Sequence, residues 1–236
     1  MEADPTGPNM GIERYSERQQ ALLRDLFHAG AILFGDVIRS RFGLHSPIYI
    51  DLRECIYARP ELLWQVGAEF AAKIRELAAA NPVPQCVVGI PDTATPLALA
   101  TAFYAWQEKF SPSITYAMLR KEAKVYPGLP AMHWIGRRDE ACEYNLIDDV
   151  VASGLTKRAA AAKMLREGIS VRRIIVLFDR EQGDGLRGEG FEVHGIFGVP
   201  DVLDFYCSEN LIRPEEHDQV IRFLRSRRFD SVPTVK

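Results

Sequence analysis

The chain has 236 residues, of which 47% are hydrophobic, so it can bury a full core as one globular α/β domain of ordinary size. Its 29 basic and 32 acidic residues leave a formal net charge of −3, which argues against a nucleic-acid-binding surface over much of the fold. No apolar stretch approaches the roughly 18 uninterrupted residues that a membrane span requires, so we expect neither nucleic acid nor membrane as a partner.

The N-terminal segment and the cysteines indicate the compartment. Residues 1–15 are acidic, contain prolines and lack an apolar centre, so we expect a disordered leader and neither a signal peptide nor an anchor. The four cysteines are far apart and form no CxxC pair, which favours reduced thiols and a cytoplasmic protein. The five histidines show no ligand spacing either, so we expect no metal held by the protein's own side chains.

The N-terminal part predicts a helix and two short strands. The helix covers 17–28 and begins with a capping box over residues 16–19, followed by an apolar stripe. Strands over 31–34 and 46–52 follow, joined by a basic, glycine-containing loop. We interpret residues 16–58 as a small accessory unit, or hood.

From Pro60 onward, apolar strand patterns alternate with helical patterns. The expected strands are 85–90, 114–119, 145–148, 172–179 and 192–199, the last at a sheet edge. The expected helices are one from Pro60 to the break at 81–82, then 96–110, 156–167, 201–208 and 215–228. This alternation predicts βαβ units and a parallel sheet covered on both faces, so residues 59–236 are expected to form an α/β core.

One interval departs from that alternation. Residues 120–144 contain two prolines and two glycines and show no clear periodicity. A loop longer than about 12–15 residues in a compact domain is usually a lid or a binding loop. The interval opens with the cationic segment RKEAK, residues 120–124, so we expect a mobile, positively charged flap that closes over a site.

The clearest chemical signal is the acid pair Asp148 and Asp149, at the expected end of a strand. Ligands of open parallel sheets bind at the carboxyl ends of strands. Behind the pair, residues 152–156 form a turn into a helix, whose free N–H groups and dipole suit a phosphate. Because carboxylates repel phosphate, the pair must serve sugar hydroxyls, a bound Mg²⁺ or both, as in a phosphorylated sugar. The structural alternative makes Asp149 a helix cap and Gly154 a tight bend.

This stretch resembles the ribose-phosphate motif of type I phosphoribosyltransferases, an apolar run followed by an acid pair and a small-residue turn. Five further stretches resemble, in order and spacing, the orotate phosphoribosyltransferases, and most closely the phosphoribosyltransferase domain of UMP synthase. They are SPIYIDLR (46–53), RPELLWQV (59–66), GIPDTATPLALAT (89–101), RKEAK (120–124) and LFDREQG (177–183). The resemblance covers roughly residues 20–225 and implies the type I phosphoribosyltransferase fold, a central parallel sheet flanked by helices with a small N-terminal hood. The decarboxylase half of the fused enzyme is not expected in a chain of this length.

The resemblance implies a glycosyltransferase of de novo pyrimidine biosynthesis. Such an enzyme transfers ribose 5-phosphate from 5-phosphoribosyl 1-diphosphate (PRPP) to orotate, giving orotidine 5′-phosphate and pyrophosphate. The resemblance also implies Mg²⁺ as a cofactor carried by PRPP, and a homodimer with shared active sites. In that dimer the last lysine of RKEAK reaches into the neighbouring subunit's site.

The same resemblance implies the roles of individual residues. The catalytic residues are Lys124, Asp148 and Asp149. The PRPP-binding residues are Thr93, Ala94, Arg120, Lys121, the acid pair, and the turn residues Ala152, Ser153, Gly154, Leu155 and Thr156. The orotate-binding residues are Arg41, Tyr49, Ile50 and Arg180. Arg180 offers a planar fork that matches a carboxylate, and an ion pair with its neighbour Asp179 or Glu181 is the alternative.

Several residues depart from the family pattern. Ala152 and Leu155 stand where the family has hydroxyl groups, and Asp92 places a carboxylate near the expected diphosphate. Val125 replaces an acid, and Pro127 stiffens the expected flap. These departures leave two alternatives open, a PRPP-dependent transferase for another base and a non-catalytic regulator that binds PRPP or a nucleotide. A receiver-type signalling domain fits poorly, because its acid pair should follow the first strand of the sheet.

Overall fold

The structure, a computed structural model, describes residues 14–39, 45–128, 131–182 and 184–226. Its helices are α1 (Glu17–His28), α2 (Arg53–Tyr57), α3 (Pro60–Ala78), α4 (Ala94–Gln107), α5 (Leu155–Arg166), α6 (Asp184–Gly188), α7 (Val199–Ser208) and α8 (Pro214–Ser226). Its strands are β1 (Ile32–Arg39), β2 (His45–Ile50), β3 (Gln85–Gly89), β4 (Ile114–Lys124), β5 (Met132–Ile135), β6 (Glu143–Val151), β7 (Arg173–Asp179) and β8 (Glu192–Gly198).

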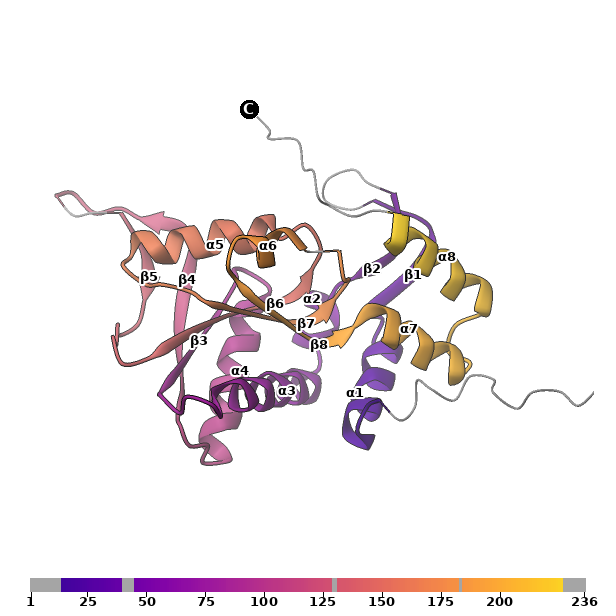
Figure 1. Cartoon of the computed structure of the whole chain (residues 1–236), viewed down its shortest axis with the longest axis horizontal. Helices are drawn as coiled ribbons and strands as arrows, with labels where there is room; N and C mark the ends of the chain where they lie inside the picture. Colours follow the sequence, from indigo (N-terminus) through magenta and orange to yellow (C-terminus); the bar gives the residue numbers. More distant parts are fainter. Residues whose placement is uncertain (1–13, 40–44, 129–130, 183, 227–236) are drawn as a thin grey trace, which may run out of the picture.

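Six strands form the central sheet in the order β5-β4-β3-β6-β7-β8. All neighbouring pairs are parallel except β4 and β5. Helices α3 and α4 lie against one face of this sheet, and α5 and α6 lie against the other (Figure 1). Every residue of β3 is buried, as expected for a strand covered on both faces. The structure therefore confirms the predicted α/β fold, with β8 as the predicted edge strand.

Helices α3 and α4 pack closely because small residues meet where the two helices contact each other. A Cβ atom added to Gly67 of α3 would lie 2.8 Å from the carbonyl carbon of Ala100 in α4, which is closer than packed atoms tolerate. Helix α4 begins directly after the loop that follows β3. The close helix packing therefore fixes the position of that loop, which forms one wall of the site described below.

Strands β1 and β2 pair antiparallel in a separate two-stranded sheet. Helix α8 contacts β2, and the small sheet lies at one end of the molecule with α1, α7 and α8 (Figure 1). One hydrophobic core extends without a break from α1 to α8. A division of the chain into a hood and a core after residue 58 remains a proposal.

The first helix begins as its sequence predicts. The Ser16 side-chain oxygen accepts a hydrogen bond from the Gln19 backbone N–H at 3.3 Å. In return, Gln19 Oε1 accepts a hydrogen bond from the Ser16 backbone N–H at 3.2 Å. Two N–H groups that the helix leaves without partners are thus satisfied, and the apolar stripe of α1 is buried in the core.

The prediction of an irregular loop over residues 120–144 is wrong. Strand β4 continues through Lys124 and pairs antiparallel with β5, with an irregularity in register between Leu119 and Lys124. Beyond Met118 this two-stranded arm no longer has β3 beside it. Its residues are therefore largely polar, and the alternation of apolar and polar residues that identifies a half-buried strand is absent.

Helix α5 holds the arm in place. The Glu167 carboxylate, directly after α5, accepts a hydrogen bond from the His133 backbone N–H at 2.6 Å and pairs with Arg138 Nη2 at 2.6 Å. Lys163 Nζ donates to the Lys121 carbonyl oxygen at 2.6 Å. The cationic segment RKEAK is therefore part of a folded arm tied to α5.

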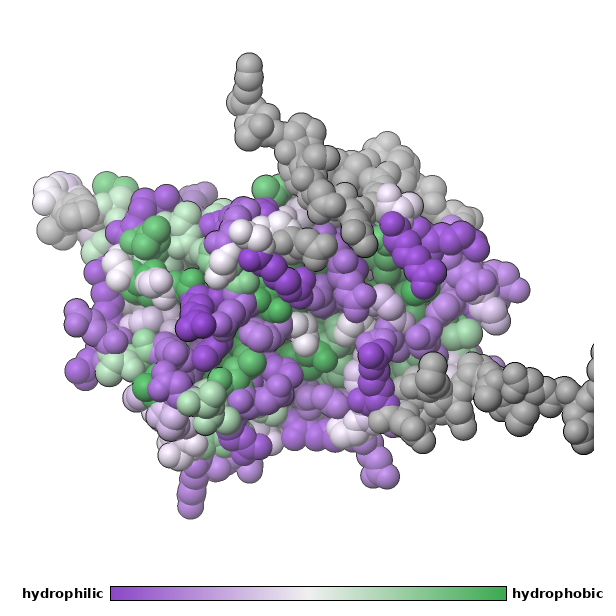
Figure 2. Space-filling view, in the orientation of Figure 1, coloured by the Kyte–Doolittle hydropathy of each residue, from purple (hydrophilic) through white to green (hydrophobic). Residues whose placement is uncertain are grey.

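The molecular surface is mixed on the face seen in Figure 2. Hydrophilic and hydrophobic residues are interspersed there, and the region around α8 is mostly hydrophilic. Within the described ranges, no helix combines the length and the hydropathy that crossing a bilayer would need.

Candidate active site

A cavity of about 250 Å³ opens beside the end of β3 and the C-terminal parts of β4 and β6. The predicted site residues that line it are Tyr49, Ile50, Thr93, Lys121, Asp148, Asp149 and Thr156. The remaining lining residues are Asp51, Arg53, Ile90, Pro91, Asp92 and Lys157. This edge of the sheet is where ligands bind in open α/β folds.

The acid pair lies within β6 and not after it. The strand continues through Val151, so the predicted strand end at residue 148 is wrong. The Asp148 side chain is buried, and its Oδ2 lies 2.5 Å from Lys157 Nζ. Lys157 also donates to the Val150 carbonyl oxygen. The Asp148 carboxylate is therefore ion-paired inside the protein, by a lysine that the sequence analysis gave no role.

Asp149 has a different environment. Its Oδ1 accepts a hydrogen bond from the Val150 backbone N–H at 2.8 Å, and in the described part of the chain it forms no ion pair. Burial first, and then the negative charge of Asp148, raise the pKa of the Asp149 carboxyl group well above its ordinary value. The pair therefore presents one carboxylate neutralised by a lysine and one that becomes charged only at a higher pH than a solvated aspartate.

The turn between β6 and α5 suits an anion. Gly154 has φ = 74°, and a Cβ atom there would lie 2.6 Å from Leu186 Cγ, so both backbone and packing require glycine. Helix α5 has no side-chain cap at its N-terminus, so the N–H groups of its first turn are open to a ligand. With the positive end of the helix dipole, these groups form a site for a phosphate. Thr156 adds a hydroxyl group at the cavity wall.

The loop from β3 to α4 forms another wall. Its Asp92 carboxylate lies 3.0 Å from Lys121 Nζ of β4, so the carboxylate that the sequence placed near the diphosphate has a cationic partner. Both side chains are exposed, and an exposed ion pair is weak. Lys121 can therefore exchange Asp92 for an anionic ligand at little cost. Helix α4 also begins without a side-chain cap, but its first turn offers no comparable set of free N–H groups. The Ala94 and Thr95 N–H groups donate to the Ile90 and Asp92 carbonyl oxygens at 3.0 and 3.3 Å, and Pro96 has no N–H.

Gly89 is required where β3 enters this loop. A Cβ atom there would lie 2.0 Å from the Ala94 carbonyl oxygen, so the loop would have to move. We expect Gly89→Ala to lower the free energy of unfolding by about 2–3 kcal/mol, as overpacking does. Urea unfolding followed by circular dichroism measures this. In the matched control Gly188→Ala the added atom meets no neighbour within 4 Å, so a change of less than about 0.5 kcal/mol is expected. Equal losses in both variants would contradict the close approach.

Tyr49, Asp51 and Arg53 form a hydrogen-bonded unit at the side of the cavity formed by the end of β2 and the start of α2. Arg53 Nη2 donates to the Tyr49 hydroxyl at 2.9 Å, and Arg53 Nε donates to Asp51 Oδ1 at 2.8 Å. The hydrogen bond from Arg53 holds the pKa of the Asp51 carboxyl group below its ordinary value. These contacts fix the Tyr49 ring in the cavity wall. Arg53 lies within the SPIYIDLR stretch, but only the fold reveals its contact with Tyr49.

Arg180 lines a neighbouring cavity of about 290 Å³ together with Glu181 and residues of α7 and α8, among them Arg225. Its Nη2 donates to the Ser46 hydroxyl of β2 at 3.4 Å, and its Nε is buried without a partner. The alternative pairing with Asp179 or Glu181 is absent among the described residues, since Asp179 instead pairs with Arg187. Burial lowers the pKa of Arg180 to about 10. A half-buried guanidinium with a buried, unpartnered Nε and no counter-ion is a binding position for an anionic group.

The other predicted site residues do not line the first cavity. Lys124 is exposed at the far end of β4, with Nζ 4.7 Å from the centre of the Tyr126 ring. The rest are Ala94, Arg120, Ala152, Ser153, Gly154 and Leu155. Arg41 lies outside the described residues.

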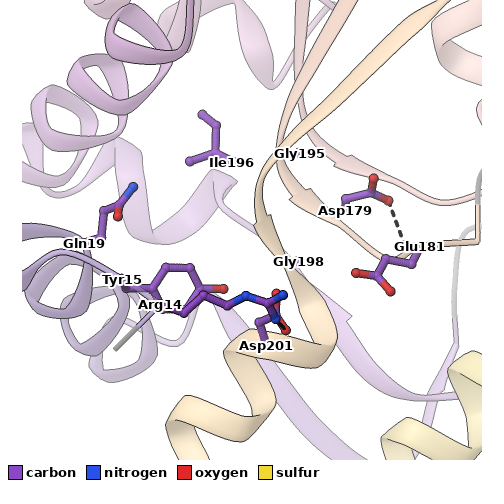
Figure 3. Close-up of a pocket in the computed structure, with 9 residues that line it drawn as sticks. All are labelled: Arg14, Tyr15, Gln19, Asp179, Glu181, Gly195, Ile196, Gly198 and Asp201. Carbon is purple, nitrogen blue, oxygen red and sulfur yellow. Dashed lines mark hydrogen bonds and ion pairs between the residues drawn. The ribbon is translucent and has the colours of Figure 1, made fainter. Parts of the chain in front are cut away.

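A third cavity, of about 340 Å³, lies beside the ends of β7 and β8 (Figure 3). Arg14 and Tyr15 extend into it from the N-terminal segment, and Arg14 pairs with Asp201. Asp179 and Glu181 add two further carboxylates to the lining. The lining has three acids and one arginine, which disfavours a phosphorylated ligand. The cavity is nevertheless larger than the one beside the acid pair. No predicted site residue lines it, so the cavity at β3, β4 and β6 is the better candidate.

Comparison with known proteins gives a consistent answer, although no model of a known protein family matches the chain. The chain is 34% identical over 224 residues to uridine 5′-monophosphate synthase of Bos taurus, covering 92% of this chain and 44% of that protein. It is 31% identical over 186 residues to orotate phosphoribosyltransferase of Thermoplasma acidophilum, covering 78% of this chain and 97% of that protein. The solved structure of Leishmania donovani UMP synthase superposes with a TM-score of 0.72 at 26% identity, over 89% of this chain and 42% of that one. The chain thus spans less than half the length of these two UMP synthases.

The parallel sheet, with an acid pair and an amide-lined turn at its edge, is the type I phosphoribosyltransferase fold. Within that class, the similarity to the Thermoplasma enzyme extends over nearly its whole length. The chain belongs to the orotate phosphoribosyltransferase family, and the resemblance seen in the sequence motifs is confirmed.

Proposed function

We propose that the protein transfers ribose 5-phosphate from PRPP to orotate, giving orotidine 5′-phosphate and pyrophosphate in pyrimidine biosynthesis. One observation carries the proposal: a single cavity joins the acid pair of β6 to the uncapped first turn of α5. The names of the relatives, orotate phosphoribosyltransferase and uridine 5′-monophosphate synthase, support it. The proposed compartment is the cytoplasm, because all four cysteines carry free thiols.

The two ends of the sugar phosphate bind to different groups in this arrangement. The 5′-phosphate lies on the N–H groups at the start of α5, and the ribose hydroxyls donate to the acid pair. Ala152 and Leu155 cannot supply the hydroxyl groups expected from the family, so the backbone N–H groups and the Thr156 hydroxyl carry the phosphate contacts. The diphosphate lies against the β3–α4 loop, where Lys121 provides a cation.

A magnesium ion carried by the diphosphate fits this loop. Mg²⁺ usually keeps several waters and binds through substrate phosphates and one or two carboxylates. Among the described residues, no group of three or more His, Cys, Asp or Glu side chains could hold a metal. Asp92, exposed on the diphosphate side of the cavity, is the carboxylate that would contact the ion. The ion, when bound, neutralises charge on the diphosphate.

Catalysis in this site rests on position and charge. As the bond from the sugar to the diphosphate breaks, the ribose ring becomes positive and the departing diphosphate becomes more negative. The carboxylates of the acid pair lie on the ribose side, and Lys121 lies on the diphosphate side. Fixed charges of the right sign at both ends stabilise the transition state more than the substrate, and the cavity wall fixes the reacting groups in line.

The orotate carboxylate is the proposed partner of Arg180, which lies between the end of β7 and β2. We expect Arg180→Met to raise the KM for orotate about 10- to 100-fold, because a charge-assisted hydrogen bond contributes about 1.5–3 kcal/mol. The Kd for PRPP should stay unchanged, and so should the fold, because the guanidinium has no counter-ion to lose. Steady-state kinetics and calorimetry measure both values. Arg222→Met, an exposed arginine of α8 outside both cavities, is the matched control. An unchanged KM would overturn the assignment.

The proposed assembly is a homodimer with shared sites. Lys124 lies outside the cavity of its own chain, so a catalytic lysine at this position needs the cavity of a second copy. Helix α4 offers a face for such a copy, since Leu99, Phe103 and Trp106 are 41%, 55% and 76% exposed on one stripe. With Trp64 of α3 they line a mainly apolar groove of about 300 Å³.

The α4 face can be tested by charge. We expect the double change Phe103→Glu and Trp106→Glu to raise the dimer dissociation constant at least about 100-fold, because large aromatic side chains dominate interface energies. Sedimentation velocity measures the change. Leu165→Glu, which charges a 68% exposed leucine on α5, is the control and should leave the dimer intact. A monomeric wild type, or a dimer that survives the double change, would rule out this face.

An ultraviolet assay of orotate consumption tests the reaction itself. The proposal expects loss of orotate only when PRPP and Mg²⁺ are both present. Uracil, purine bases and small pyridine carboxylates, offered in place of orotate, test the alternative of another acceptor. Arg180, whose Nε is buried without a partner, favours an acidic one. Binding of PRPP without turnover of any base would instead support a regulator.

A further inference from the structure

Lys157 is a buried lysine in the floor of the sugar-phosphate cavity. Its side chain is 5% exposed. Its Nζ lies 2.5 Å from Asp148 Oδ2 and 3.4 Å from Thr156 Oγ1, and it also donates to the Val150 carbonyl oxygen. A lysine ammonium has three protons, so all of them have partners. The three partners belong to the acid-pair strand and to the first turn of α5.

The position of Lys157 is unfavourable for a lysine for two reasons. Burial of an ammonium group is costly unless a counter-ion is present. The first turn of a helix also disfavours a cation, because the helix dipole is positive there. Lys157 meets both penalties in the first turn of α5, and the Asp148 carboxylate offsets them. Lys157 is therefore not a solvated surface residue, and the carboxylate it contacts belongs to the site.

The two aspartates therefore differ in whether their carboxylate oxygens are available to a ligand. Asp148 has one oxygen engaged by Lys157, and its other oxygen accepts the Asp149 backbone N–H at 3.0 Å. Asp149 lines the cavity and forms no ion pair with any described residue. The positive charge of Lys157 also opposes the rise in the pKa of the Asp149 carboxyl group that burial and Asp148 cause.

We infer that Lys157 is a positioning residue of the sugar-phosphate site: it fixes Asp148 and the α5 turn in place and leaves Asp149 as the carboxylate that accepts the hydrogen bonds of the ribose hydroxyls. This inference rests on the proposed function, since it assigns the ribose to the acid pair. It adds a residue that belongs to neither the acid pair nor the turn amides.

PRPP binding should depend on the ionisation of Asp149 and therefore on pH. A ribose hydroxyl donates more strongly to a carboxylate than to a carboxylic acid, so PRPP affinity should increase as pH rises and Asp149 ionises. Removing the Lys157 charge should move that increase to higher pH. The other charged or titratable side chains around the cavity are Tyr49 of β2, Asp51 directly after β2, Arg53 of α2, Asp92 of the β3–α4 loop and Lys121 of β4.

The test compares Lys157→Met and Lys157→Arg with the wild type across pH 5.5–9. Two readouts are used: calorimetric Kd for PRPP, and carbon-13 NMR titration of the aspartate carboxyl groups in the ligand-free protein. In Lys157→Met we expect PRPP affinity at pH 7 to fall about 10- to 100-fold, in line with the loss of a buried charge pair, and Asp149 to titrate at higher pH. Lys157→Arg should retain the wild-type pH profile. Lys73→Met, which breaks a surface pair with Glu76 on α3, should change neither readout.

The outcomes separate the two proposals. If the wild type binds PRPP and Lys157→Met changes neither its pH profile nor the Asp149 titration, the role of Lys157 is wrong while the proposed function stands. If the wild type does not bind PRPP, the proposed function is wrong, and the titration still reports whether Lys157 controls the acid pair. Should Lys157→Met fail to fold, nitrogen-15 NMR of the wild type decides the matter. One lysine ammonium should exchange slowly with water and remain so after PRPP is added, and its release on binding would overturn a positioning role.

Discussion

Changing Lys124 to alanine is expected to lower kcat by about 10²–10³-fold, the usual loss when one preorganised charge at the transition state is removed. The free energy of unfolding should change by less than about 0.5 kcal/mol, because Lys124 is exposed and its recorded side-chain contact is with the Tyr126 ring. Single-turnover kinetics and urea unfolding measure the two values. Glu122→Ala, an exposed residue on the same strand, is the matched control and should retain activity.

Mixed dimers test whether Lys124 acts in the neighbouring subunit. A dimer of one Lys124→Ala chain and one Asp149→Asn chain has two defective sites if Lys124 serves its own chain. If Lys124 crosses to its partner, both lesions fall in one site, and the other site is intact. We therefore expect the mixed dimer to recover activity that neither parent dimer has. Lys124→Ala homodimers within about threefold of wild-type kcat would contradict a catalytic role altogether.

The two aspartates of the acid pair should respond oppositely to replacement by asparagine. Asp148→Asn leaves the Lys157 ammonium buried without a counter-ion, so we expect a loss of about 3–5 kcal/mol of stability. Asp149→Asn should lower kcat/KM for PRPP by about 10²-fold while leaving the protein at least as stable as the wild type.

The sign of the Asp149 effect on stability follows from its pKa. The pKa is raised in the folded state, so the carboxyl group favours folding below its unfolded pKa, and that contribution is lost as pH rises through the folded pKa. Asparagine does not ionise, so Asp149→Asn should gain stability relative to the wild type as pH rises. Urea unfolding at pH 5 and pH 8 measures the difference. A variant that is less stable than the wild type at pH 8 would show that the Asp149 carboxylate is structural.

The long, regular elements of the fold could be predicted from the sequence because their burial imposes a period. The capping box at Ser16 located the start of α1, and the apolar runs of β3 and β7 located the central strands. The five-residue helices α2 and α6 gave no period to detect. The arm formed by β4 and β5 was missed because strands without a buried face need no apolar alternation.

The residues of the candidate site likewise fall into those that the local sequence predicts and those that only the fold brings together. Asp148 and Asp149 could be predicted because the acid pair, the turn and the helix start are adjacent in sequence. The partner of Asp92 is Lys121, 29 positions away, and only the parallel pairing of β3 and β4 brings the two together. Lys157 stands in the sequence TKR, and such a polar, basic segment is typical of the solvated face of a helix. Its burial against Asp148 depends on how α5 packs on the sheet, which local sequence does not determine.

A crystal structure of the protein with PRPP and Mg²⁺ tests the sugar-phosphate site most directly. We expect the 5′-phosphate within hydrogen-bonding distance of the N–H groups at the start of α5, the ribose hydroxyls on the acid pair, and the diphosphate beside Lys121. PRPP bound in the acid-lined cavity of Arg14 and Asp201, or a donor that leaves the α5 turn empty at saturating concentration, would contradict it.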